Sequence, residues 1–253
     1  MKLPLHEYSA LTFDCFGTLI DWETGILSVL RPWAKSAGVD ASDDALLGAY
    51  ARAESVQELE TPGALYREVL RGVMHRIGDD LGGAVSADDA EALSVSIGEW
   101  PVFEDTPAAL ASLQERAKLI VVSNVDRMSF ERAAQKLGVE LDGLVTAEDV
   151  GAYKPDVRMF RAALEEVARH GVKPQQHLHV AQSMHHDIAP AGGLGIATCW
   201  IDRRAGRPGG ATPESHGTTR PGWMFTTMRE LAESASVSES AANAAQNGPD
   251  DDE

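Results

Sequence analysis

The stretch Ala10-Leu-Thr-Phe-Asp-Cys-Phe-Gly-Thr18 decides the fold, because a short apolar run ends there at a carboxylate and a glycine-containing turn. Further apolar runs of strand length follow at Ala117–Val122, His177–Val180 and Ala197–Ile201. Segments with helical spacing alternate with these runs, at Pro107–Glu115, Ser129–Leu137 and Val157–Ala168. The alternation predicts βαβ units and an α/β fold with a parallel sheet. Ligands bind at the carboxyl ends of the strands in such sheets, so a site is expected around Asp14.

The segment 22–99 has a different pattern, in which apolar residues recur at helical spacing with almost no strand signal. Helices are expected over Ile26–Ala34, Asp44–Leu59, Gly63–Ile77 and Ala87–Ile97. This pattern predicts a helical domain, 22–99, inserted into an α/β core domain formed by residues 1–21 and 100–231. Residues 232–253 are mostly small or acidic and include no Lys or Arg, so a disordered acidic tail is expected there.

The composition limits the class of protein. Among the 253 residues, 22 Lys and Arg face 39 Asp and Glu, and the formal net charge of −17 argues against nucleic-acid binding. No apolar run is long enough to span a membrane, and the first residues are too polar for a signal peptide. Cys15 and Cys199 are too few for a disulfide framework or a four-thiolate zinc site. We therefore expect a cytoplasmic protein whose partner is a small-molecule substrate, with a homodimer left open.

Polar residues follow the predicted strands at the points where these strands end. Thr18 comes shortly after Asp14, Ser123 precedes Asn124 after the second run, and a polar loop that ends at Asp187 follows the third. Each of these residues alone has an ordinary explanation as a turn or helix-capping residue. Their convergence at one edge of one sheet is not predicted by those explanations, and it indicates a functional site.

Four motifs carry a resemblance to a known family: Asp14-Cys-Phe-Gly-Thr18, Val122-Ser-Asn124, Tyr153-Lys-Pro155 and Val180-Ala-Gln-Ser-Met-His-His-Asp187. In order and spacing they resemble the motifs of the haloacid dehalogenase superfamily. The resemblance implies a Rossmann-like parallel sheet core with a helical cap inserted after the first strand motif. It also implies that Asp14 is the nucleophile, that Ser123 and Lys154 hold its carboxylate and the developing charge, and that the cap closes over the substrate.

Two departures from the family pattern decide which branch the chain resembles. Phosphatase members have a second Asp two residues after the nucleophile, where this chain has Phe16, and a Gly-Asp pair where it has Ala181-Gln182. Phe16 cannot transfer a proton, and an amide is a weaker ligand than a carboxylate for Mg²⁺. The pattern instead resembles the type II (L-2-haloacid) dehalogenases, which have an aromatic residue at this position and need no metal. The resemblance therefore implies a 2-haloacid dehalogenase without metal or cofactor.

Other interpretations stay open at this point. A Mg²⁺-dependent phosphatase of the same fold, a hydrolase of another activated carbon centre and a binding protein without turnover are all compatible with the fold. Intact Asp14, Ser123 and Lys154 count against the last of these.

Several further residues are candidates for substrate binding. The expected set around the nucleophile is Phe16, Asn124, Ser183 and His185. Dehalogenases of the family use a cap arginine to hold the substrate carboxylate or the halide, and Arg52 is the nearest candidate for that role. His177, His179, His185 and His186 cluster in the sequence, but they have no Cys or Glu partner at ligand spacing, so no metal site is expected.

Overall fold

One parallel sheet of six strands organises the protein, and its strand order is β3-β2-β1-β4-β5-β6. The computed structural model describes residues 3–212 and 219–234. Within them the strands are β1 (Ala10–Phe13), β2 (Lys118–Ser123), β3 (Gly143–Thr146), β4 (His177–Ala181), β5 (Ala197–Ile201) and β6 (Trp223–Phe225). The predicted α/β fold with a parallel sheet is confirmed.

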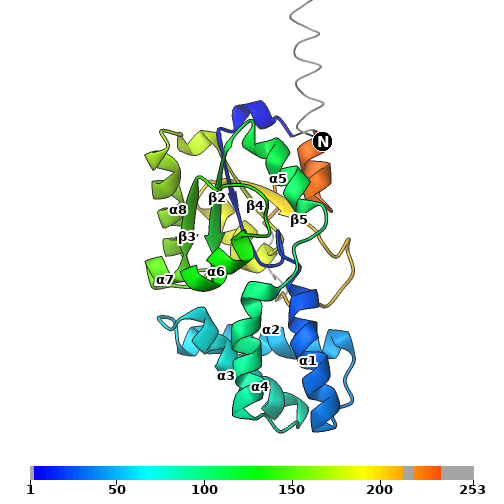
Figure 1. Cartoon of the computed structure of the whole chain (residues 1–253). Coiled ribbons are helices and arrows are strands. Elements are labelled where there is room, and N and C mark those ends of the chain that lie inside the picture. Colours follow the sequence, from blue (N-terminus) through cyan, green and yellow to red (C-terminus); the bar gives the residue numbers. More distant parts are fainter. Residues whose placement is uncertain (1–2, 213–218, 235–253) are drawn as a thin grey trace, which may run out of the picture.

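The central strand β1 is buried along its whole length, which explains its continuous apolar sequence. Its last residue, Phe13, is in register with Val121 of β2 and Val180 of β4. Helices flank the sheet (Figure 1): α5 (Thr106–Gln114), α6 (Arg127–Ala134), α7 (Ala147–Val150), α8 (Val157–Arg169) and α9 (Ala189–Gly193), with short turns η1 (Leu5–Glu7), η3 (Pro174–Gln176) and η4 (Met184–Ile188).

Four helices gather at the end of the sheet where β1 stops, below it in Figure 1, and are called the cap helices here. They are α1 (Trp22–Ala37), α2 (Asp43–Glu60), α3 (Tyr66–Leu81) and α4 (Ala87–Ser96), and the short η2 (Ile97–Glu99) leads back to the sheet. Local sequence sets their ends: the side chains of Asp21, Ser42 and Ser86 cap the amino termini of α1, α2 and α4. Helices α1 and α3 end at Gly38 and Gly82 in the left-handed conformation that glycine adopts readily.

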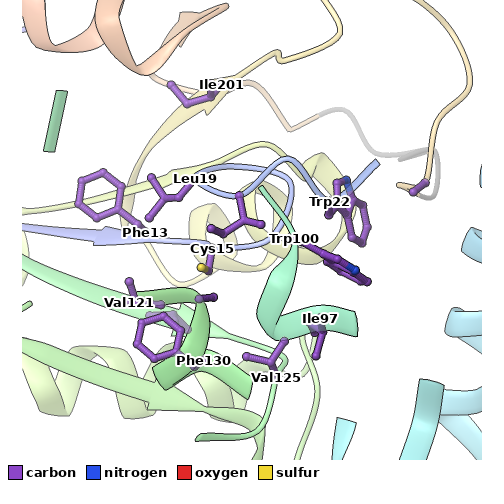
Figure 2. Close-up of a cluster of buried hydrophobic side chains, with 14 of the residues drawn as sticks. Phe13, Cys15, Leu19, Trp22, Ile97, Trp100, Val121, Val125, Phe130 and Ile201 are labelled. Atoms are coloured by element: carbon purple, nitrogen blue, oxygen red, sulfur yellow. The ribbon is translucent and has the colours of Figure 1, made fainter. Parts of the chain in front are cut away.

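The chain enters and leaves the cap helices through a buried aromatic junction. Figure 2 shows Trp22 and Trp100 in the same hydrophobic cluster as side chains of the sheet. A β-carbon at Gly25 of α1 would lie 2.1 Å from Trp100, so only glycine allows this packing. The ring of Phe16 packs edge to face on Trp100, with ring centroids 5.7 Å apart. The junction therefore ties the loop after Asp14 to the base of the cap helices.

The structure differs from the sequence-based expectations at three places. Strands β3 and β6 were not predicted; they are the two edge strands of the sheet, have four and three residues, and are less buried than the inner strands. The expected tail was placed too early: residues 228–234 are helical, Ala232 is buried, and Ser234 Oγ accepts a hydrogen bond from the Leu3 N–H at 3.0 Å. The rest of that segment, 235–253, lies outside the described residues. None of the described helices is long and apolar enough to cross a membrane.

Candidate active site

The candidate site lies at the carboxyl ends of β1, β2 and β4. Connections leave β1 towards β2 on one side, and the later strands β4 and β5 lie on the other, so the crevice at this edge is a topological switch point. Asp14 follows β1 directly, and its backbone N–H donates to Val180 O at 3.0 Å. Asp14, Ser123 and Lys154 line one cavity of about 40 Å³. The structure thus brings together three of the predicted catalytic side chains.

A lysine bridges two buried carboxylates at the base of this cavity. Lys154 Nζ lies 2.7 Å from Asp14 Oδ1 and 2.8 Å from Asp187 Oδ1, and it also donates to Val122 O at 3.1 Å. All three charged side chains are at most 9% exposed. The attraction is strong because little water screens it. Lys154 therefore holds both carboxylates in fixed positions.

Burial and charge act in opposite directions on the pKa values of this triad. Burial alone lowers the pKa of Lys154, but the attraction of Asp14 and Asp187 outweighs it and raises this pKa above its ordinary value. Burial raises the pKa of Asp14, which Lys154 and Thr18 only partly offset. For Asp187 burial is outweighed by Lys154 and His179, which lower its pKa to about 2. Of the two carboxylates that contact Lys154, Asp187 is therefore the one that ionises more readily.

The second oxygen of Asp14 is held by the loop that follows β1. Thr18 Oγ1 donates to Asp14 Oδ2 at 2.6 Å and accepts from the Gln182 N–H at 2.8 Å. The side-chain carbonyl of Gln182 in turn accepts from Thr212 Oγ1 at 2.8 Å. With Lys154 on Oδ1 and Thr18 on Oδ2, the Asp14 carboxylate is fixed at both oxygens.

The residues at this site do not fit Mg²⁺, the ion that phosphatases of this fold use. At the sheet edge an Mg²⁺ site needs carboxylates whose charge is not already neutralised by a neighbouring cation. Here the ammonium of Lys154 already contacts both Asp14 and Asp187, and Gln182 presents a neutral amide engaged by Thr212. Across the described residues, no three His, Cys, Asp or Glu side chains are grouped to hold a metal ion.

A buried network that the sequence analysis missed supports Asp187 from below. His179 Nε2 lies 3.1 Å from Asp187 Oδ1, and His179 Nδ1 lies 2.8 Å from Thr12 Oγ1, which is 2.6 Å from His177 Nε2. Burial lowers the pKa of His177 to about 3, so this ring is neutral. The signal was available, because Thr12 and His179 are directly opposite in the register of β1 and β4. His179 therefore positions Asp187 directly, and His177 supports His179 through Thr12.

The cap helices contribute a carboxylate to the same cavity, which the sequence analysis also missed. Glu54 of α2 is 4% exposed and lines the cavity with Tyr66. Its Oε1 accepts hydrogen bonds from the hydroxyls of Tyr66 and Tyr50, the latter at 3.2 Å. Burial raises the pKa of Glu54 to about 7. Tyr50, Glu54 and Glu58 recur every four residues, so they share one face of α2, but the spacing alone does not show that this face meets the cavity.

Asn124 links the sheet edge to the cap helices. Its Oδ1 accepts from the Lys154 N–H at 2.7 Å, and its Nδ2 donates to Glu58 Oε1 at 3.2 Å. Burial raises the pKa of Glu58 well above its ordinary value. Asn124 lines the cavity as expected, but its side chain is engaged with Lys154 and Glu58 rather than with Asp14.

The structure does not place Arg52, the residue expected to hold the substrate, at this cavity. Its side chain is 65% exposed and forms an ion pair with Asp80 of α3 at 2.6 Å. Successive α-helical residues are rotated by about 100°, so Arg52 and Glu54, two positions apart, project from nearly opposite faces of α2. The face that meets the cavity carries the carboxylate instead.

Of the remaining residues expected to bind the substrate, Phe16 and Ser183 lie at the cavity and His185 does not. Phe16 and Ser183 line the cavity, and Ser183 Oγ accepts from the His186 N–H at 2.9 Å. His185 does not line it. That ring packs on His186, with centroids 4.9 Å apart, and borders a neighbouring cavity of about 430 Å³. His186 takes the place expected for His185, because the turn η4 directs the second histidine inward.

A buried aspartate–lysine pair lies at the carboxyl edge of a parallel sheet, and helices inserted after the first strand cover it, as expected for a hydrolase of the class that the sequence motifs resemble. The chain belongs to the haloacid dehalogenase-like hydrolase family, whose model matches residues 8–195. The (S)-2-haloacid dehalogenase of Pseudomonas putida is 24% identical over 218 residues, which cover 80% of this chain and 88% of that protein.

Other relatives differ in the reaction that their names describe. The phosphoserine phosphatase of Thermus thermophilus is 27% identical over 177 residues, 68% of each protein. The fold matches the L-2-haloacid dehalogenase of Xanthobacter autotrophicus, solved with chloropropionic acid covalently bound, with a TM-score of 0.72. That structure is 16% identical, and the match covers 89% of this chain and 97% of the other. The class of hydrolase is thus established, and the reaction must be argued from the site.

Proposed function

We propose that this protein is a metal-independent hydrolase in which Asp14 displaces a leaving group such as halide from a small, activated carbon centre. The observation that carries the proposal is the 2.7 Å contact between Asp14 Oδ1 and Lys154 Nζ. It supplies a buried counter-ion for the nucleophile without a metal. Phe16 stands where a phosphatase needs a proton donor.

The chemistry is complete with these residues. The Asp14 carboxylate attacks an sp³ carbon, the leaving group departs with the bonding electrons, and an ester with Asp14 is formed. Halide needs no proton to leave, which suits the aromatic ring of Phe16. Water then attacks the ester carbonyl, the alcohol product leaves, and one proton is released. Lys154 and Thr18, which hold the two Asp14 oxygens, can stabilise the charge that develops there.

The identity of the carbon centre depends on the charge of the cavity. A 2-haloacid carries a carboxylate, which would need a cation beside it once it is buried. Among the described residues that line the cavity, Lys154 is the one cation, and two carboxylates already contact it. This favours an activated carbon centre without a carboxylate over a 2-haloacid. The poor fit for Mg²⁺ argues against phosphoryl transfer.

Isotope labelling in H₂¹⁸O tests the displacement. The protein is incubated with 2-chloropropionamide, 2-chloropropionate or p-nitrophenyl phosphate, in the presence of EDTA or of Mg²⁺. It is then digested, and the mass of the peptide that contains Asp14 is determined by mass spectrometry. Attack of water on an Asp14 ester leaves ¹⁸O in this carboxylate, whereas cleavage of an aspartyl phosphate at phosphorus puts the label into phosphate. We expect labelled Asp14 and chloride release in EDTA. Activity that requires Mg²⁺, or turnover with an unlabelled Asp14, would contradict the proposal.

A further inference from the structure

On the cap side of the cavity, Glu54 has one carboxylate oxygen that the described part of the chain leaves without a hydrogen bond. Glu54 Oε1 accepts from the hydroxyls of Tyr50 and Tyr66, which also contact each other at 2.9 Å. Within the described residues no hydrogen-bond partner is found for Oε2. The two tyrosines therefore fix the Glu54 carboxyl group and leave one of its oxygens available to a ligand in the cavity.

The charges around the cavity add up to an excess of negative charge. Asp14, Asp187 and Glu54 line it, against one ammonium group on Lys154. His186 adds no charge, because burial lowers its pKa to about 4. A substrate carboxylate placed here would face Glu54 without a free cation, which disfavours its binding. A group that donates hydrogen bonds would instead satisfy the available oxygen of Glu54.

The size of the cavity sets the size of the substrate. A volume of 40 Å³ holds about three water molecules. A compound of a few non-hydrogen atoms fits, with its reacting carbon at Asp14 and its other end towards α2. The rings of Tyr66, Phe16 and Trp22 line the cavity and would pack against such a compound.

We propose that Glu54 is a substrate-binding residue that selects an uncharged hydrogen-bond donor, such as a primary amide, where a 2-haloacid would carry its carboxylate. This inference rests on the proposed function and names its substrate class. Two interactions of Glu54 would give this specificity: it accepts a hydrogen bond from the amide, and it repels the like charge of the acid.

The test compares 2-chloropropionamide with 2-chloropropionate, which differ in charge but hardly in shape. Chloride release is measured at about pH 8, where Glu54 is mostly ionised. We expect kcat/KM of the wild type to favour the amide by about a hundredfold. Glu54→Gln should reduce this ratio at least about tenfold, mainly by admitting the acid, because the new amide group can donate to a carboxylate. A wild type that prefers the acid, or a ratio that Glu54→Gln leaves unchanged, overturns the inference.

Glu60→Gln is the matched control, since Glu60 lies at the end of the same helix, pairs with Arg76 and is 57% exposed. It should leave the ratio unchanged, and an equal change in both variants would point to an effect of net charge alone. Tyr66→Phe supplies a second variant that keeps the charge of Glu54 but removes one of its hydrogen bonds. It should weaken amide turnover without admitting the acid, and admission of the acid would contradict the role of charge.

Binding of the reaction products separates this inference from the proposed function. Lactamide and lactate are titrated into the wild type and Glu54→Gln and followed by NMR, which needs no turnover. A preference for lactamide that is lost in Glu54→Gln supports the inference even when neither chloro compound releases chloride. In that case only the proposed displacement by Asp14 would be contradicted. Preference for lactate, or binding of neither compound, overturns the inference even when turnover is present.

Discussion

The sheet side and the cap side of the cavity differ in how they are built and in what they supply. On the sheet side, Asp14 directly follows β1, Lys154 lies in the loop between α7 and α8, and Asp187 lies in η4. Together these three side chains carry a net charge of −1. On the cap side, α2 contributes Glu54, held by two tyrosines and without a cation. In the proposals above, the sheet side performs the displacement. The cap side selects the substrate. Function can therefore change in this fold through one helical face while the nucleophile stays in place.

The largest effect is expected from removing the cation of the sheet side. Lys154→Met leaves Asp14 and Asp187 as buried carboxylates next to each other, which should lower the free energy of unfolding by about 3–5 kcal/mol and abolish turnover. Urea unfolding at neutral pH measures the change. Lys118→Met is the control, because Lys118 is 51% exposed in its pair with Asp142 and should cost less than about 1 kcal/mol. Equal losses in the free energy of unfolding of the two variants would show that the buried ion pair stabilises the fold no more than the exposed one.

Next in size is the effect of removing the nucleophile while keeping its shape. Asp14→Asn retains the hydrogen bond from Thr18 but cannot attack as an anion, so kcat should fall about a thousandfold, or about 4 kcal/mol in activation free energy. Chloride release is the assay, and circular dichroism shows whether the fold is kept. Activity above about a hundredth of the wild type would mean that another group or water performs the displacement.

On the cap side, the pH dependence of stability should reveal the buried charge of Glu54. Its pKa is about 7 in the folded protein and about 4.5 ordinarily, so between these values the folded state holds a proton that the unfolded state has lost. Stability from this group is present below pH 4.5 and is lost as the pH rises to 7. Glu54→Gln removes this loss, and relative to the wild type it should gain about 2–3 kcal/mol between pH 4.5 and 8.

Urea unfolding of both proteins across this range measures the difference, in which the other titrating groups cancel to first order. A constant difference between the two proteins would mean that Glu54 keeps its ordinary pKa. It would also mean that Tyr50, Tyr66 and Asp14, which contact or surround it, do not hold it in a desolvated position.

The same comparison explains how much could be predicted from the sequence. Part of the sheet side was predictable from a local signal, in which an apolar run ends and a polar residue begins, as at Phe13 and Asp14. Lys154 follows no such run and was identified through its motif. The order of strands then brings those ends together. The cap side was not predictable in this way, because the sequence pattern of an amphipathic helix does not show which of its faces contacts the other domain. Resemblance to the dehalogenases favoured an arginine on α2, and the rotation of that helix places Glu54 at the cavity instead.

The smallest effect is expected from removing Arg52. This variant tests which face of α2 meets the substrate. Because Arg52 pairs with Asp80 on the exposed face, Arg52→Ala should leave KM for both chloro compounds unchanged and alter stability by less than about 0.5 kcal/mol. Steady-state kinetics at several substrate concentrations and urea unfolding check this. A KM for 2-chloropropionate that rises about a hundredfold, with the amide unaffected, would mean that α2 turns in the working enzyme and brings a cation to the cavity. The carboxylate would then have its partner, and Glu54 would lose its role in excluding it.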